Sequence, residues 1–164
     1  MLSKDGYECV ERKCCTGVVA VIAVTPNNEL ILVDQFRPPM GGNVIELPAG
    51  LVGDKPNEGD QGDPEATAAL RELMEETGYT SDTIIPMCHG PVSPGMTSEA
   101  LTILLATGCQ KMASGGGVAA EGEEITVHVV PQKELDQWLT AQEEAGKSVD
   151  LKVRLAQCLM AYSG

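Results

Sequence analysis

The segment from Asp63 to Gly78 constrains the fold more than any other part of this chain, because its caps and its periodicity together specify one helix. Asp63 is a favourable N-cap, Pro64 suits the first helical position, and Gly78 favours termination. We therefore predict a helix over residues 64–77. At about 100° per residue, four side chains of this helix share a face that can pack on a sheet: Ala66, Leu70, Leu73 and Thr77.

A second face of the predicted helix collects negative charge from Glu65, Glu72, Glu75 and Glu76. Glu72 and Glu76 are four residues apart, so their like charges repel by roughly a few tenths of a kcal/mol when solvated and by more when buried. A hard divalent cation would relieve this repulsion, and carboxylate oxygens suit Mg²⁺ or Mn²⁺. Arg71 precedes Glu75 by one helical turn and can hold it in position. Taken alone, such an acidic cluster is more often a solvated helix face.

The run from Arg71 to Tyr79, R-E-L-M-E-E-T-G-Y, resembles the Nudix hydrolase signature G-x5-E-x7-R-E-U-x-E-E-x-G-U, where U is a bulky apolar residue. The upstream half departs from that pattern. Asp63 stands where the family has its first Glu, and twelve residues rather than five separate it from Gly50, which matches the leading Gly. The extra residues fall in the turn-rich stretch 53–62, where a longer surface loop costs little.

Three further blocks resemble the ADP-ribose (ADP-sugar) pyrophosphatase branch of this family. They are Q-F-R-P followed by E-L-P-A-G in residues 35–50, S-P-G-M-T-S-E in residues 93–99, and E-G-E-E-I in residues 121–125. The resemblance runs from about residue 17 to residue 162. Four blocks in the family's order are far more specific than one, so they reduce the weight of the solvated-face interpretation.

The resemblance implies a role for particular residues of this chain. Glu72 and Glu76, with Glu75 as a further candidate, would hold Mg²⁺ or Mn²⁺ together with the carbonyl of Ala49. Three side chains would contact the substrate: Arg37, Glu46 and Met96. Glu46 could bind metal instead. The general base would come from the late acidic loop, where the residue count favours Glu123 or Glu121 over Glu124 without separating the first two.

Charge and composition limit the class of partner. With 11 Lys and Arg against 24 Asp and Glu, the formal net charge is −13, which repels nucleic acids and anionic membranes. There is no run of eighteen apolar residues and no signal-peptide pattern. The six cysteines form no C-x2-C pair and are interpreted as reduced thiols, with a zinc site as a remote alternative. We expect a cytoplasmic enzyme with a nucleotide-sugar substrate.

The remaining pattern predicts one domain over residues 1–164, with 1–16 as a short N-terminal segment. Predicted strands are 17–24, 30–36, 44–46, 100–107 and 125–130, and further predicted helices are 132–144 and 150–162. Strands mixed with three helices indicate an α/β protein, and the resemblance implies a Nudix-type α/β/α sandwich with a mixed sheet. Because Tyr7 is the only aromatic residue before the first core strand, we expect a homodimer that completes the adenine pocket.

The leading functional hypothesis is Mg²⁺-dependent hydrolysis of the diphosphate bond of ADP-ribose, or of a related ADP-sugar, to AMP and a sugar phosphate. One alternative is a pyrophosphatase for another nucleoside diphosphate sugar. A second alternative is a non-catalytic Nudix module that binds ADP-ribose. The intact carboxylates Glu72, Glu75 and Glu76 argue against that module, because binding alone does not need a metal cluster.

Overall fold

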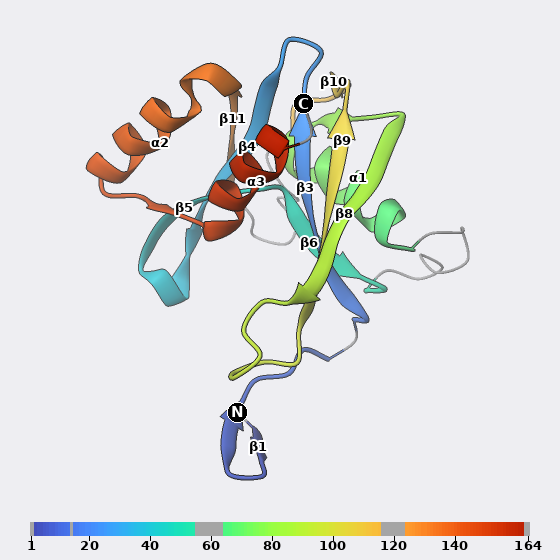
Figure 1. Cartoon of the computed structure of the whole chain (residues 1–164), viewed down its shortest axis with the longest axis vertical. Coiled ribbons are helices and arrows are strands. Elements are labelled where there is room, and N and C mark those ends of the chain that lie inside the picture. The colour runs from blue at the N-terminus through green and yellow to red at the C-terminus, as the bar shows by residue number, and fades with distance from the viewer. Residues whose placement is uncertain (1, 14, 55–63, 116–123, 163–164) are drawn as a thin grey trace.

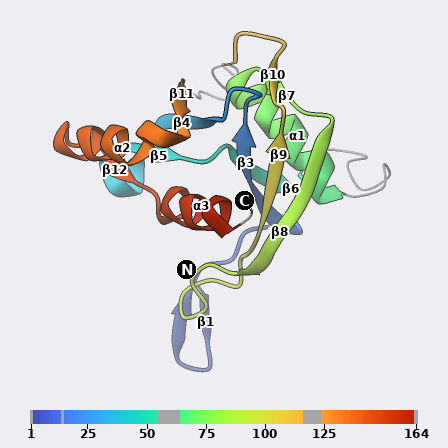
Figure 2. The same ribbon diagram turned by 45° about the horizontal axis from the view of Figure 1, so that its top comes forward.

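The computed structural model of the chain describes residues 2–13, 15–54, 64–115 and 124–162. A central sheet separates one helix on one face from two helices on the other (Figures 1 and 2). The helices are α1 (Pro64–Thr77), α2 (Leu135–Glu144) and α3 (Leu151–Tyr162). This arrangement confirms the expected α/β/α sandwich, and α1 has the predicted bounds. None of the helices in these ranges is long and apolar enough to cross a membrane.

The sheet has the strand order β12-β5-β4-β3-β9-β8, with β11 added to β4 and β6 added to β3. The sheet is mixed because β3 runs parallel to β9 and β12 runs parallel to β5, whereas its other pairs are antiparallel. Its strands are β3 (Gly17–Val24), β4 (Glu29–Arg37), β5 (Gly42–Glu46), β6 (Ala49–Val52), β8 (Thr83–Pro91), β9 (Ala100–Thr107), β11 (Ile125–Pro131) and β12 (Ser148–Val149).

The two central strands separate soon after their hairpin. β3 and β4 pair only where Ala23 and Val24 meet Ile31 and Leu30. Beyond that point β4 pairs with β5 and β11, whereas β3 pairs with β6 and β9. The chain crosses from one half of the sheet to the other between β5 and β6, where the amide of Val21 donates to the carbonyl of Pro48 at 2.8 Å. This crossing positions the residues described below.

Apolar side chains fill the space on each face of the sheet. The core under α2 and α3 includes Ile22, Leu32, Leu135 and Val153, whereas the core under α1 includes Val21, Ile31, Ala69 and Leu73. On α1 the predicted stripe is confirmed at Leu73 and Thr77, which are buried, and at Ala66, which is half-buried and packs against the core under α1. Leu70 is only half-buried. The buried face is instead completed by Ala68, Ala69 and Glu76. Ala68 and Ala69 belong to the core under α1, and Glu76 is buried on the same face of the helix.

Several short or irregular elements were not predicted. The N-terminal strands β1 (Leu2–Lys4) and β2 (Tyr7–Cys9) form a hairpin, which lies away from the helices in Figure 1. β8 is an edge strand, with a bulge between Pro86 and Cys88. The pair β7 (Tyr79–Thr80) and β10 (Gln110–Lys111) follows α1 and β9. The 3₁₀ helix η1 (Pro38–Met40) follows β4. A second 3₁₀ helix, η4 (Gln132–Glu134), is the first turn of the helix predicted over residues 132–144 and leads directly into α2.

Candidate functional site

Helix α1 places two of its carboxylates against the bend that joins β5 to β6. The side chain of Glu72 lies so close over Gly50 that a Cβ added there would overlap the carboxylate. The amide of Ala49 donates to Glu76 Oε2 at 3.1 Å, and Glu76 is only 5% exposed. The bend and the acidic face of α1 therefore form one unit, and a side chain at position 50 would displace the Glu72 side chain.

Arg71 offsets the negative charge of this unit. Its Nη1 donates to Glu72 Oε1 at 2.8 Å and to Glu75 Oε2 at 3.3 Å. Its Nη2 donates to the carbonyl of Leu51 at 3.1 Å and to Asp54 Oδ1 at 3.1 Å. The expected support of Glu75 by Arg71 is thus present. The sequence did not indicate that the same guanidinium also fastens Glu72 and β6.

Burial raises the pKa of Glu72 to about 7, although the neighbouring Arg71 acts in the opposite direction. The carboxylates of Glu75 and Asp54 add to the increase because they are like charges. A carboxylate with this pKa is only partly ionised near neutral pH. A cation bound beside it would favour the ionised form, and oxygen donors of this kind suit a hard divalent ion.

Within the described ranges, no group of three or more Asp, Glu, His or Cys side chains is arranged to hold a metal ion. The predicted ligands are oriented toward protein donors instead, since Glu72 and Glu75 bind Arg71 and Glu76 binds the amide of Ala49. The structure therefore brings Glu72 and Glu76 to one bend of the chain, and Arg71 joins Glu75 to Glu72. Their metal role, and that of the Ala49 carbonyl, stays a prediction.

A second polar group lies on the same face of the sheet. Glu46, which is 8% exposed, receives Nη2 of Arg37 at 2.5 Å and Nε of Arg37 at 3.0 Å. Gln35 Nε2 also donates to Glu46, at 3.2 Å. Glu46 pairs in register with Val33, and Val33, Gln35 and Arg37 alternate along β4 on the side that faces α1. Two residues predicted separately, Arg37 and Glu46, are therefore one ion pair.

Other predicted residues have different surroundings. Met96 is 62% exposed, and its carbonyl accepts from the amide of Val10 at 2.9 Å beside the N-terminal hairpin. Glu121 and Glu123 lie outside the described residues. Glu124 is exposed and directly precedes β11, whose first residue, Ile125, pairs with Gln35. The roles of all four residues stay predictions.

Sequence reasoning missed Gln35 and Asp54 as members of this region. Gln35 could have been found, because it is two residues from Arg37 on a predicted strand and must share its face. Asp54 gave no comparable signal, since it lies two residues after the end of β6 and reaches Arg71 only in the folded chain.

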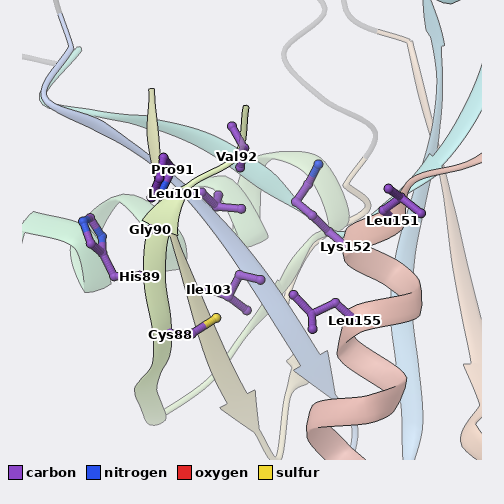
Figure 3. Close-up of a pocket in the computed structure, with 10 residues that line it drawn as sticks. All are labelled: Cys88, His89, Gly90, Pro91, Val92, Leu101, Ile103, Leu151, Lys152 and Leu155. Atoms are coloured by element: carbon purple, nitrogen blue, oxygen red, sulfur yellow. The ribbon is translucent and has the colours of Figure 1, made fainter. Parts of the chain in front are cut away.

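The opposite face of the sheet holds a pocket of about 350 Å³, shown in Figure 3 between β8, β9 and α3. Cys88, Ile103 and Leu155 point into it, and most of its lining is apolar. Leu101 and Ile103 belong to the core under α2 and α3, so the sheet separates this pocket from Glu72 and Glu76. None of its lining residues belongs to the cluster of carboxylates on α1.

The two histidines contact neighbouring side chains of the fold, and the described cysteines form no disulfide. His89 Nδ1 lies 2.8 Å from Thr102 Oγ1. His128 packs against Trp138 with ring centroids 5.0 Å apart, and burial lowers its pKa. Its neighbour Asp34 is buried, yet hydrogen bonds from Lys147 and Asn43 keep the pKa of Asp34 below its ordinary value. The described cysteines are free thiols: Cys9, Cys15, Cys88, Cys109 and Cys158.

Comparison with known proteins gives the following similarities. A family model described as the NUDIX domain matches residues 16–151. The chain is 43% identical over 90 residues to the ADP-ribose pyrophosphatase of Bacillus subtilis (strain 168), covering 55% of this chain and 45% of that protein. It is 38% identical over 102 residues to the methanol dehydrogenase activator of Bacillus methanolicus, covering 62% and 51%. The chain spans about half the length of these curated relatives.

A solved structure described as an ADP compounds hydrolase has a similar fold, with a TM-score of 0.58. The match covers 74% of this chain and 61% of that one. At 19% sequence identity, this likeness concerns the fold alone.

Proposed function

Because this chain belongs to the Nudix family, we propose that it hydrolyses the diphosphate bond of ADP-ribose, or of a related ADP-sugar, to AMP and a sugar phosphate. The observation that carries this proposal is the contact between α1 and the bend after β5. There Glu72 covers Gly50, and Glu76 binds the amide of Ala49. Similarity to an ADP-ribose pyrophosphatase supports the substrate class.

Nudix hydrolases use divalent metal ions, and we infer that this chain uses Mg²⁺, with Mn²⁺ as a substitute. When bound, such an ion neutralises phosphate charge and lowers the pKa of water. Glu72, Glu75, Glu76 and the carbonyl of Ala49 would hold it. Their oxygen chemistry fits this ion, as does the raised pKa of Glu72, a half-buried carboxylate whose desolvation outweighs the effect of Arg71.

Arg37 would bind the diphosphate of the substrate. A chain with a net charge of −13 repels an anionic ligand, so the site needs a local cation. Glu46 and Gln35 fix the direction of the guanidinium, while the Arg37 side chain stays 43% exposed and accessible to a ligand. A guanidinium oriented in advance loses less side-chain entropy when it binds phosphate.

The proton of the attacking water would pass to a carboxylate of the late acidic loop. Glu121 and Glu123 are the candidates, with Glu124 as the remaining alternative. A general base of this kind contributes about 10²–10⁴-fold to a rate. The oxygen of that water would bond to one phosphorus of the diphosphate as the bond from this phosphorus to the bridging oxygen breaks. The two products would be AMP and the sugar phosphate.

The test is a substrate panel containing ADP-ribose, other ADP-sugars and sugar diphosphates of the other bases, assayed with Mg²⁺ and with EDTA. Mass spectrometry identifies the products. AMP and ribose 5-phosphate formed only with Mg²⁺ would support the proposal. A different nucleotide product would favour the other pyrophosphatase alternative, and tight binding of ADP-ribose without turnover would establish a non-catalytic module. The variant Glu72→Gln, assayed in the same panel, tests the proposed metal ligand. Its control is Glu144→Gln, which makes the same change of charge at an exposed position on α2.

We also propose that the working form is a homodimer. Tyr7 and Met96 line a cavity of about 340 Å³ between the N-terminal hairpin and the loop after β8. Tyr7 is 69% exposed in the single chain and could serve a neighbouring copy. Closed two-fold dimers are the commonest oligomers of soluble proteins.

A further inference from the structure

Arg71 joins helix α1 to the chain that leaves β6, and it divides its two amino groups between them. Nη1 donates to Glu72 Oε1 at 2.8 Å and to Glu75 Oε2 at 3.3 Å, both on α1. Nη2 donates to the carbonyl of Leu51 at 3.1 Å and to Asp54 Oδ1 at 3.1 Å. A guanidinium carries its N–H donors in a rigid planar fork, so it can serve both sides at once.

Asp54 reaches Arg71 from a turn that follows β6. The chain bends at Gly53, whose φ of +77° lies in the left-handed region that favours glycine. The side chains of Asp54 and Arg71 are 25% and 20% exposed, so salt screens this pair less than it screens a fully exposed pair. Gly50 lies at the start of the same short stretch, under Glu72. The Asp54–Arg71 pair therefore fastens the stretch that begins at the bend to α1.

Arg71 and a divalent cation would compete for the same carboxylates. Glu72 and Glu75 are proposed ligands, and in this structure both accept hydrogen bonds from Arg71. A guanidinium that has lost these partners would carry an unbalanced positive charge close to the ion and would repel it. Asp54 contacts the other amino group and is not a proposed ligand. It can therefore balance the charge of Arg71 whether Glu72 and Glu75 bind the guanidinium or the ion.

We propose that Asp54 is a positioning residue for metal binding, because it neutralises Arg71 while Glu72 and Glu75 exchange the guanidinium for the ion. The inference rests on the proposed function, since it needs these two carboxylates as ligands. Without a carboxylate at position 54, Arg71 would hold Glu72 and Glu75 more firmly and would repel the ion more strongly. Both effects weaken metal binding. Loss of a group that supports metal ligands typically lowers affinity about 10- to 100-fold.

The test is Asp54→Asn, which removes the charge and keeps the size of the side chain. Its matched control is Asp82→Asn, which makes the same change at an exposed position between β7 and β8. Calorimetric titration with Mg²⁺ at pH 8 should give a dissociation constant raised about 10-fold in Asp54→Asn and less than about 2-fold in Asp82→Asn. Equal affinities in the two variants would overturn the inference.

An Arg71→Gln background shows whether Asp54 acts through Arg71. The guanidinium is gone there, so adding Asp54→Asn should change the dissociation constant for Mg²⁺ by less than about 3-fold. A loss of about 10-fold in this background as well would mean that Asp54 attracts the ion directly, and it would overturn the positioning role.

Thermal unfolding separates a role in metal binding from a role in folding. Because Mg²⁺ binds the folded chain, saturating Mg²⁺ raises Tm by an amount that grows with its affinity. Asp54→Asn should therefore lower Tm, relative to wild type, more in Mg²⁺ than in EDTA. An equal loss in both conditions would indicate a purely structural contact and would overturn the inference. This comparison decides alone if Arg71→Gln does not fold.

Failure of the proposed function gives a different result. A wild-type chain that binds Mg²⁺ but hydrolyses no nucleotide sugar refutes the proposed hydrolysis, whereas weaker Mg²⁺ binding by Asp54→Asn would still support the role of Asp54. An active wild-type chain whose Mg²⁺ affinity is unchanged by Asp54→Asn overturns only the role of Asp54. A wild-type chain without measurable affinity for Mg²⁺ overturns both the metal assignment and this inference.

Discussion

Acidification should weaken metal binding through Glu72. A proton on this carboxylate competes with the ion, and burial raises the pKa of Glu72 to about 7. For one competing proton with that pKa, the apparent dissociation constant for Mg²⁺ rises about 50-fold between pH 7 and pH 5, and little between pH 7 and pH 9. A glutamate with its ordinary pKa of 4.5 would give only a small change in this range.

The same pKa predicts the opposite effect on stability when no metal is bound. The folded-state pKa of Glu72 lies above its ordinary value of 4.5, so its contribution to stability is full below pH 4.5 and is lost as the pH rises through about 7. Glu72→Gln removes this ionisation. The variant should therefore have a higher Tm than wild type at pH 8 in EDTA and a lower Tm than wild type in saturating Mg²⁺.

Calorimetric titration with Mg²⁺ at pH 5, 6, 7 and 8 measures the first effect, and thermal unfolding with and without EDTA measures the second. In Glu72→Gln the affinity should be low and its dependence on pH in this range should largely disappear. Glu144→Gln makes the same change of charge on an exposed part of α2 and should retain the wild-type slope. A wild-type affinity that changes less than about 5-fold between pH 7 and pH 5 would refute the argument that burial controls this carboxylate.

Four further outcomes are expected. Arg37→Ala should raise KM for ADP-ribose about 10- to 100-fold with little change in kcat, because it removes a charged hydrogen bond of roughly 1.5–3 kcal/mol that is present throughout the reaction. An unchanged KM in steady-state assays would show that the side chain does not contact the substrate. Among Glu121→Gln, Glu123→Gln and Glu124→Gln, single-turnover rates should reveal one variant with kcat lowered about 10²–10⁴-fold; three unaffected variants would place the base elsewhere. Gly50→Ala should weaken Mg²⁺ binding at least about 10-fold, because its methyl group displaces the carboxylate of Glu72, a proposed ligand. Retention of the wild-type affinity in calorimetry would contradict this. Light scattering at micromolar concentration should give twice 17.3 kDa, and a fully active species of 17.3 kDa would rule out the required dimer.

Local sequence signals predicted the main helices and strands where caps, turns and periodicity agreed. The bounds of α1 followed from Pro64 and Gly78, and β9 was predicted over residues 100–107 from its apolar run. β8 was missed because Pro86, Gly90 and Pro91 interrupt any alternation, and its pairing with β9 holds it extended. The N-terminal hairpin did carry a signal: Asp5 and Gly6 form the turn, both with positive φ, and Asp-Gly is a favoured pair in such turns.

The chemical groups of the candidate site could be predicted more fully than their contacts. The spacing of Glu72, Glu75 and Glu76 indicated a shared helix face, but not that Glu76 would be buried against Ala49. The pairing of Arg37 with Glu46 depends on the register between β4 and β5, and the sequence of either strand alone does not determine that register. Contacts of this kind arise from tertiary packing, so a one-dimensional pattern cannot specify them.

The exposed edge of β8 has a consequence for the behaviour of concentrated solutions. From Thr83 to Pro91 this strand carries no Asp, Glu, Lys or Arg, so it has no charge of its own to repel a second strand. Pro86 offers no amide for pairing, and the bulge after it breaks the register. At low ionic strength the net charge of −13 keeps molecules apart, but salt screens it. At high ionic strength, resistance to edge-to-edge aggregation therefore depends on the two prolines of the strand, Pro86 and Pro91, and on the bulge.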